Sequence, residues 1–332
     1  MTDNNTLIAI DIPSLDHTTF SLSFNQSKSH TTWIDWGDNN HNQREIYDEV
    51  GIISLIHTYA EPGQYNIELI VVDDGTIDLI SIGDDEGYHN MITQVTIGSA
   101  VTSIGERAFA NCNNLENLQF AEDCAPEIKP YAFANCGSLT TVTIPNNANL
   151  LDGIFYNCSS LKEVTFTGGI ATIWANVFCG CSQLKTINIP EEFDIYEIAD
   201  YAFQGCKKLK NINFCKNVTK IGNSSFDSCT SLSKIEFTNI QSIGSNAFCN
   251  CTFLTNANIP ETIKTIGDGA FFNSNFLKKF QITAIQPPIL EGSNAFDGAS
   301  DLTIEVPLNS LQDYMNATNW AVYSDCIKEI EQ

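Results

Sequence analysis

The chain has 332 residues, 43% of them hydrophobic and 10% aromatic, which is enough to bury a sizeable core in roughly two domains. It carries 40 acidic and 16 basic residues, a formal net charge of −24, and the basic residues look spread along the chain. This charge balance counts against binding to nucleic acid, because a protein that binds nucleic acid needs clustered lysines and arginines. It also counts against binding to an anionic membrane surface.

The acidic charge is concentrated at the N-terminal end. Residues 1–86 hold 16 acidic residues against Lys28 and Arg44, a net charge of −14, and all five histidines fall before residue 90. This asymmetry predicts a first domain at residues 1–86. The start MTDNNTLIAIDIP lacks the basic region of a signal peptide, and no apolar run approaches 18 residues, so we expect neither a leader nor direct membrane insertion.

The first domain is predicted to be a small all-β sandwich, because segments such as TFSLSF (19–24) and YNIELIVV (65–72) alternate apolar and polar residues. TTWIDWGDNN (31–40) and HTYAEPGQYNIELIVV (57–72) resemble the paired signatures of a polycystic-kidney-disease-type (PKD) domain, with Trp36 and Asn39 departing from the usual residues. The resemblance implies that His57 is a structural hydrogen-bonding residue near the Gly-Asp turn rather than a catalytic one. The acidic residues there match no calcium loop, and a solvated acidic turn is the favoured interpretation.

A repeat dominates the rest of the chain. A Phe recurs every 22 to 25 residues, with a Cys three places later in most copies and a Leu six places later in all of them. The Phe positions are Phe109, Phe133, Phe155, Phe178, Phe203, Phe226, Phe248, Phe271 and Phe296. The Cys positions are Cys112, Cys136, Cys158, Cys181, Cys206, Cys229 and Cys251, followed by Ser274 and Ala299.

Each Leu begins a short alternating segment, as in LTTVTIP (139–145) and LSKIEF (232–237), and several copies carry a second apolar pair, as in VTKIG (218–222). One such unit cannot bury its apolar side alone, so about nine units must stack into a mainly β solenoid. The pattern resembles the BspA-like (Treponema-type) leucine-rich repeats, whose unit runs LxxIxIPxxVxxIGxxAFxxC. On this basis we expect a solenoid at residues 87–307, entered through ITQVTI (92–97), and a C-terminal cap at residues 308–332.

The repeated cysteines allow several interpretations. A zinc site needs ligands that converge on one ion, whereas a solenoid places equivalent residues in a line, and a nucleophile needs an activating base although no His follows residue 89. Disulfides are conceivable among the residues outside the repeat frame, Cys124, Cys179, Cys215, Cys249 and Cys326. The favoured interpretation is a small core filler, because Ser274 and Ala299 replace Cys in the same frame. No cofactor and no metal are expected.

The residues between the apolar strand positions should form columns across the exposed face of the sheet. Two exposed aromatic residues, Trp174 in place of the Gly of an IG pair and Tyr196 in a longer loop beside Phe193, add a second candidate contact surface. The predicted ligand surface therefore comprises Thr143, Thr165, Asn188, Asn213, Glu236, Asn258, Trp174 and Tyr196.

The favoured function is a non-enzymatic binding module for a protein or a glycan. The BspA-like resemblance implies adhesion, with a host matrix or a cell surface as partner and a surface location. The alternative is a structural or receptor-binding component of a larger particle, such as a phage appendage or an injection-system fibre, for which an oligomer is expected. An enzyme is the third interpretation. It would need a clustered acidic pair, for which EEFD (191–194) is the best candidate in the sequence.

Overall fold

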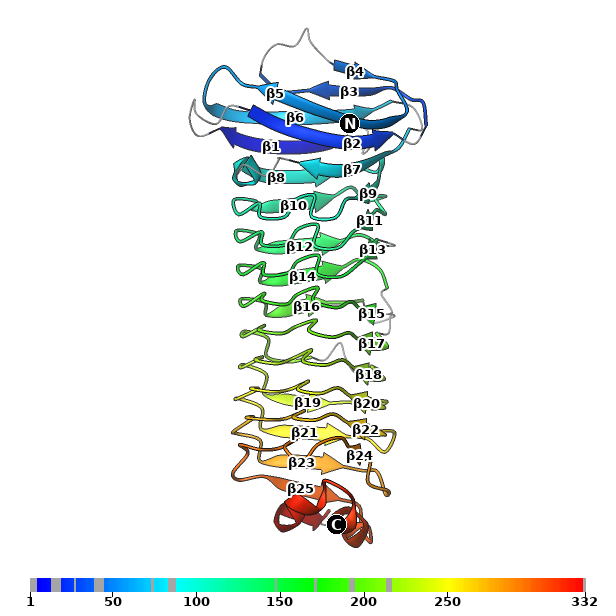
Figure 1. Cartoon of the computed structure of the whole chain (residues 1–332), viewed down its shortest axis with the longest axis vertical. Coiled ribbons are helices and arrows are strands. Elements are labelled where there is room, and N and C mark those ends of the chain that lie inside the picture. Colours follow the sequence, from blue (N-terminus) through cyan, green and yellow to red (C-terminus); the bar gives the residue numbers. More distant parts are fainter. Residues whose placement is uncertain are drawn as a thin grey trace. The chain divides into compact units, whose positions relative to one another are not determined.

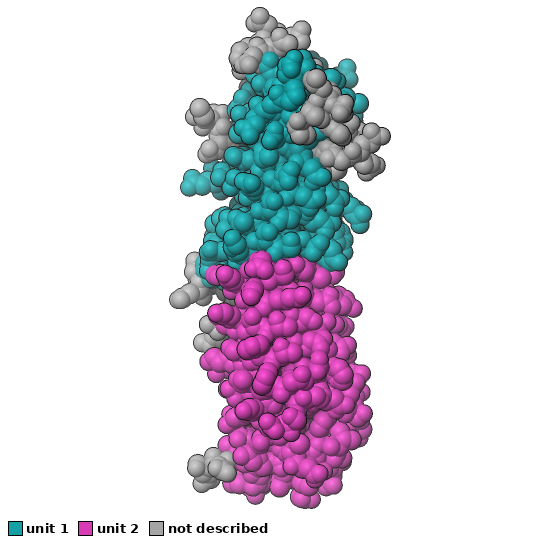
Figure 2. Space-filling model, turned by 90° about the vertical axis from the view of Figure 1, so that its left-hand side faces the viewer, with its two compact units in different colours: residues 1–169, 187–190 teal, residues 170–186, 191–332 magenta. Residues whose placement is uncertain are grey.

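The computed structural model describes residues 5–12, 19–26, 28–38, 45–72, 75–82, 88–146, 148–169, 172–190, 195–212 and 217–330. The chain is mainly β, and its strands are labelled in Figure 1. It divides into two compact units, which are coloured separately in Figure 2. Unit 1 comprises Met1–Gly169 and Ile187–Pro190, and unit 2 comprises Ile170–Thr186 and Glu191–Gln332.

The N-terminal part of unit 1 consists of seven strands that contribute to two sheets. In these strands apolar residues alternate with polar ones, as in β2 and β6, and one set of side chains is buried. The strands are β1 (Thr6–Ile12), β2 (Thr19–Gln26), β3 (Thr32–Asp35), β4 (Glu45–Tyr47), β5 (Gly51–Thr58), β6 (Gly63–Val71) and β7 (Ile77–Ile82). The order in one sheet is β1-β6-β3-β4 and in the other β7-β2-β5.

The motif residues of this part contact one another. His57 Nε2 lies 3.2 Å from Asp38 Oδ2, and the His57 ring stacks on Trp36 at a centroid distance of 4.7 Å. The Tyr59 hydroxyl donates to the Trp36 carbonyl oxygen at 3.0 Å. The contact of His57 beside the Gly-Asp turn that the sequence predicts is therefore present.

Both N-terminal sheets continue into the repeats. Strand β1 pairs with β8 (Ile92–Ile97) in antiparallel orientation, and β7 pairs with β9 (Val101–Ile104) in parallel orientation. The segments on either side of residue 86 thus belong to the same sheets and the same compact unit. The domain boundary at residue 86 remains a sequence-based prediction.

Most repeat turns contribute a strand after the repeated Leu, and each turn contributes a second short strand before the Phe. Among the described residues, no strand follows Leu209. The first kind continues from β8 with β10 (Asn117–Phe120), β12 (Thr141–Ile144), β14 (Glu163–Phe166), β16 (Thr186–Asn188), β19 (Lys234–Glu236), β21 (Asn256–Ile259), β23 (Lys279–Ile282) and β25 (Thr303–Val306). The second kind continues from β9 with β11 (Glu127–Ile128), β13 (Asn149–Leu150), β15 (Thr172–Ile173), β17 (Glu197–Ile198), β18 (Lys220–Ile221), β20 (Ser242–Ile243), β22 (Thr265–Ile266) and β24 (Ile289–Leu290).

The repeated Phe side chains form a stacked ladder within each unit. In unit 2 the successive centroid distances from Phe178 to Phe296 lie between 5.2 and 5.5 Å, with interplanar angles of 20° or less. In unit 1 Phe109 and Phe133 stack at 5.0 Å. Because these rings are almost fully buried, the ladder is the apolar axis on which the turns pack.

The repeated Cys side chains are hydrogen-bond donors as well as core filler. The Sγ of Cys229 lies 3.2 Å from the carbonyl oxygen of Phe203 in the preceding turn, and equivalent bonds are made by Cys136, Cys158, Cys206 and Cys251. Ser274 makes the same bond through its hydroxyl, 2.9 Å from the Phe248 carbonyl oxygen. The expectation of a purely apolar filler was therefore incomplete, because the thiol also donates a hydrogen bond to a buried carbonyl group.

The residue two places after each Phe has a left-handed backbone. This position has a φ between 56° and 96° in all nine copies, and it is held by Asn, Gly or Ser. Asn and Gly tolerate this conformation best, which explains why the residue before the Cys is so restricted. The positions are Asn111, Asn135, Asn157, Gly180, Gly205, Ser228, Asn250, Asn273 and Gly298.

The buried cysteines should be unreactive in the folded protein. Burial raises the pKa of the Cys136, Cys206 and Cys251 thiols well above their usual value, so the reactive thiolate is scarce near pH 8. Cys326 is half-exposed, whereas the other ten cysteines that the structure describes are buried. We expect an alkylating reagent at pH 8 to modify Cys326 more than about tenfold faster than these three residues, as followed by site-resolved mass spectrometry.

In denaturant all twelve cysteines should react without prior reduction, since the eleven described ones are thiols. Cys215 lies outside the described residues. Pairing of the repeat-frame cysteines under non-reducing conditions would contradict this arrangement.

The C-terminal segment packs on the last Phe of the ladder. It contains α1 (Leu311–Asn316), a short 3-10 helix (Ala321–Cys326) and β26 (Ile327–Glu329), which pairs with β25 in parallel. Trp320 is buried, with its ring centroid 6.1 Å from that of Phe296, and its indole N–H donates to the Pro288 carbonyl oxygen at 2.8 Å. The segment therefore covers the apolar end of unit 2, as a cap must do.

Candidate ligand-binding surface

The predicted polar columns exist within each unit. In unit 1 Thr143 pairs with Thr165 across β12 and β14, and the Asn188 side-chain amide donates to Glu163 Oε1 at 2.7 Å and to Thr165 Oγ1 at 3.1 Å. Asn188 and Thr143 are exposed, and Thr165 is half-buried. Three of the predicted surface residues thus lie side by side on one sheet face.

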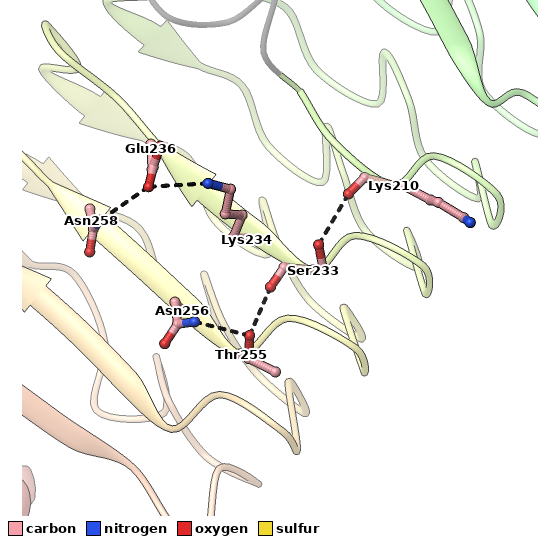
Figure 3. Close-up of polar contacts among 7 residues, drawn as sticks. All are labelled: Lys210, Ser233, Lys234, Glu236, Thr255, Asn256 and Asn258. Carbon is pink, nitrogen blue, oxygen red and sulfur yellow. Dashed lines mark hydrogen bonds and ion pairs between the residues drawn. The ribbon is translucent and has the colours of Figure 1, made fainter.

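A second polar cluster lies on unit 2 (Figure 3). Glu236 accepts from Lys234 Nζ at 3.4 Å and from the Asn258 amide at 3.5 Å. Asn256 donates to Thr255 Oγ1 at 3.2 Å, which itself donates to the Ser233 carbonyl oxygen at 3.1 Å. Each of these two hydrogen-bonded groups connects the β19 turn to the β21 turn, and together they make an ordered polar surface.

The structure does not bring the remaining candidates to that surface. Trp174 and Tyr196 are exposed, but they flank the paired strands β15 and β17, which belong to another sheet than β19 and β21. Asn213, Phe193 and the acidic segment at residues 191–194 lie outside the described residues. Within unit 2, Trp174 and Tyr196 therefore form a group apart from Glu236 and Asn258.

Two exposed aromatic residues that the sequence reasoning missed lie next to the unit 2 cluster. Phe253 and Phe276 occupy the position five places after the ladder Phe, they are 63% and 55% exposed, and their rings lie 6.1 Å apart. Phe253 lies three residues before the start of β21, and Phe276 lies three residues before the start of β23. Large apolar side chains exposed as a pair are typical of contact surfaces.

The missed signal was present in the sequence. Read from turn to turn, the column before the conserved Leu is polar except at these two positions: Asn114, Ser138, Ser160, Gln183, Lys208, Ser231, Phe253, Phe276 and Asp301.

The same region is basic in an acidic chain, which corrects the expectation that the basic residues are spread along the chain. Residues 207–279 hold nine lysines and four acidic residues, a net charge of +5, while the rest of the chain holds seven basic and 36 acidic residues. Six of the nine lysines lie in the turns or strands of the polar sheet, namely Lys207, Lys208, Lys210, Lys234, Lys278 and Lys279. Lys279 pairs with Glu305 at 2.8 Å.

Among the described residues, no group of three or more His, Cys, Asp or Glu side chains is arranged to hold a metal ion. Within the same residues, none of the helices is long and apolar enough to cross a membrane.

Comparison with known proteins decides the family. Residues 80–197 and 192–303 match the BspA type leucine rich repeat region in six copies. The chain belongs to this family. No curated protein sequence matches the chain.

Several known structures resemble this BspA-type chain. A leucine rich cell surface protein from Faecalibacterium prausnitzii is 20% identical, with a TM-score of 0.46, and the match covers 80% of this chain and 93% of that one. The T. pallidum leucine rich repeat protein is 22% identical, with a TM-score of 0.37, covering 68% and 83%. The pneumococcal vaccine antigen PcpA is 15% identical, with a TM-score of 0.35, covering 77% and 82%.

In this BspA-type repeat the buried motif residues build the scaffold, and the surface differs where individual turns depart from the motif. Phe253, Phe276 and the lysine-rich turns are such departures. They define a candidate surface on unit 2, formed by Phe253, Phe276, Lys234, Glu236, Asn256 and Asn258 and called the aromatic-lysine surface below.

Proposed function

We propose that the protein is a non-enzymatic binding module of the cell-surface type, and that its aromatic-lysine surface holds an anionic protein or glycan. The exposed pair Phe253 and Phe276 carries this proposal, because an isolated polar sheet face offers little binding energy whereas desolvated aromatic side chains offer much.

The charge of the surface supports an anionic ligand. Lys234 and Lys279 engage Glu236 and Glu305, but Lys278 in the turn of Lys279, and Lys207, Lys208 and Lys210 in the turn before Lys234, add exposed positive charge. In Figure 3 the ammonium group of Lys210 points away from the other labelled residues. A local excess of positive charge on an otherwise acidic molecule steers anionic ligands to one face.

The proposal predicts that the Phe253→Ala/Phe276→Ala double variant loses binding. A screen of the whole chain against sulfated, sialylated and neutral glycans and matrix proteins should yield anionic ligands, and the double variant should bind them at least about tenfold more weakly. Surface plasmon resonance measures the affinity of the unchanged chain and of the double variant for each ligand.

Tyr196→Ala is the matched control, since Tyr196 is an exposed aromatic residue of the same unit outside the aromatic-lysine surface. It should leave the affinity unchanged. If Tyr196→Ala abolishes binding while the double variant retains it, the surface assigned here is wrong. If the whole chain binds no glycan and no protein in the screen, the binding function itself fails.

We also propose that residues 1–86 form a PKD-like sandwich that serves as a spacer. Support comes from the contacts among the motif residues, where Trp36, Asp38, His57 and Tyr59 pack and bond together. The match to the repeat family begins at residue 80, within strand β7.

A further inference from the structure

Strand β5 is an unusual edge strand. Of the strands that the structure describes, only β2 pairs with β5, through eight successive residue pairs without a register shift. The opposite edge of β5 therefore presents backbone N–H and C=O groups that no described strand uses. At eight residues it is longer than β4, the three-residue strand at the edge of the other sheet.

The side chains of β5 do not protect this edge. Natural edge strands usually carry a charged residue, a proline or a bulge that prevents further pairing. The sequence GIISLIHT of β5 contains no Asp, Glu, Lys, Arg or Pro. Its outer-face residues Ile52 and Ile56 are 71% and 73% exposed, and on the other face Ile53 and Leu55 are half-buried.

The edge is also preorganised. The Gln26 amide donates to the Glu49 carbonyl oxygen at 2.8 Å and holds the turn before β5, while His57 at the other end is held by Asp38 and Trp36. When another strand joins this edge, β5 therefore loses little conformational entropy.

The ends of β5 are acidic. Asp48 and Glu49 precede the strand, Glu61 follows it, and all three are exposed. A second copy paired antiparallel about the middle of β5 would place Asp48 opposite Glu61 at both ends. Since residues 1–86 also carry a net charge of −14, a second copy is a poor occupant.

We propose that β5 binds an extended peptide segment of another protein, which adds a strand to the sheet and carries lysine or arginine at both ends of an apolar run. The backbone groups of the segment would pair with the open edge, and its apolar residues would cover Ile52 and Ile56 on one face and Ile53 and Leu55 on the other. This surface lies on unit 1 and is independent of the aromatic-lysine surface.

The test uses the whole chain and a synthetic peptide with a short run of valines between pairs of lysines. Fluorescence anisotropy should show saturable binding, and hydrogen exchange should show slower exchange of β5 amides in the complex. The same peptide with glutamates at its ends, and the lysine peptide N-methylated at alternate residues, should each bind at least about tenfold more weakly.

The variant Ile56→Lys should weaken binding of the lysine peptide by a similar factor, because it places a solvated charge on the covered face. Ile285→Lys, at another exposed isoleucine on unit 2, makes the same change elsewhere, and this variant should bind the lysine peptide as the unchanged protein does. Thermal unfolding checks that both variants fold.

Equal binding of the lysine and glutamate peptides would overturn the proposal, as would undiminished binding by Ile56→Lys. A dimer in sedimentation velocity that Ile56→Lys dissociates would show that a second copy occupies the edge, which also overturns it.

Discussion

Replacing Phe226 with Ala should lower the free energy of unfolding by about 3–5 kcal/mol, the usual cost of truncating a buried Phe. Phe226 is fully buried and stacks on Phe203 at 5.2 Å and on Phe248 at 5.3 Å, so the truncation leaves a cavity and removes two ring contacts. Urea unfolding followed by circular dichroism measures the change as a shift of the midpoint at similar slope.

Phe253→Ala is the matched control for this variant, since it makes the same truncation on the exposed side of the next turn. We expect its effect on unfolding to stay within about 0.5 kcal/mol. A comparable loss at both positions would show that the stacked ladder is not the stabilising axis of unit 2.

Gly267→Ala should destabilise the protein by about 3 kcal/mol or more, at the upper end of the range for overpacking. A Cβ at this position would lie 2.3 Å from the Ser245 nitrogen and 2.5 Å from the Gly244 carbonyl carbon. Both are backbone atoms of the preceding turn and cannot rotate away. The Gly267 N–H also donates to the Ile243 carbonyl oxygen at 2.8 Å, which holds the two turns at this spacing.

Gly137→Ala provides the comparison for Gly267→Ala, because a Cβ there meets only the Asn113 Oδ1 atom, at an ordinary contact distance of 3.5 Å. The free energy of unfolding of Gly137→Ala should lie within about 0.5 kcal/mol of that of the unchanged protein. If Gly267→Ala is equally mild, the glycine of the IG pair is not required by the close approach of the turns.

The repeat could be predicted well because its signals are local. Strand positions follow from alternation at a period of two, and stacking follows from the 22 to 25 residue period, so segments such as LTTVTIP became β12 as expected. The join between the N-terminal strands and the repeats could not be predicted. It depends on β1 meeting β8 and β7 meeting β9, and no pattern within either segment specifies that pairing.

The donor role of the cysteines was harder to foresee because hydropathy treats sulfur as apolar. Ser274 was the informative residue, since a fully buried hydroxyl usually has a hydrogen-bond partner, and a carbonyl that accepts from Ser274 indicates an equivalent acceptor for cysteines in the same frame. The sequence reasoning used Ser274 only as evidence for a small side chain.

The candidate surface was predicted in part. The columns that contain Asn188, Glu236 and Asn258 were placed correctly on exposed faces, because a regular sheet fixes which side chains point outward. Trp174 and Tyr196 are exposed as expected, but they lie on a different sheet from Glu236 and Asn258. Sequence spacing shows that residues recur in a column, but not which columns lie next to each other.

The shared sheets at the N-terminal end connect the first repeat turns directly to the N-terminal strands. Strands β1 and β7 shield one side of β8 and of β9 in the way that a terminal cap shields the first turn of a repeat array. A truncation that begins after residue 86 would uncover two strand edges at once and invite self-association. The smallest fragment of unit 1 that keeps its repeat edges covered includes the N-terminal strands.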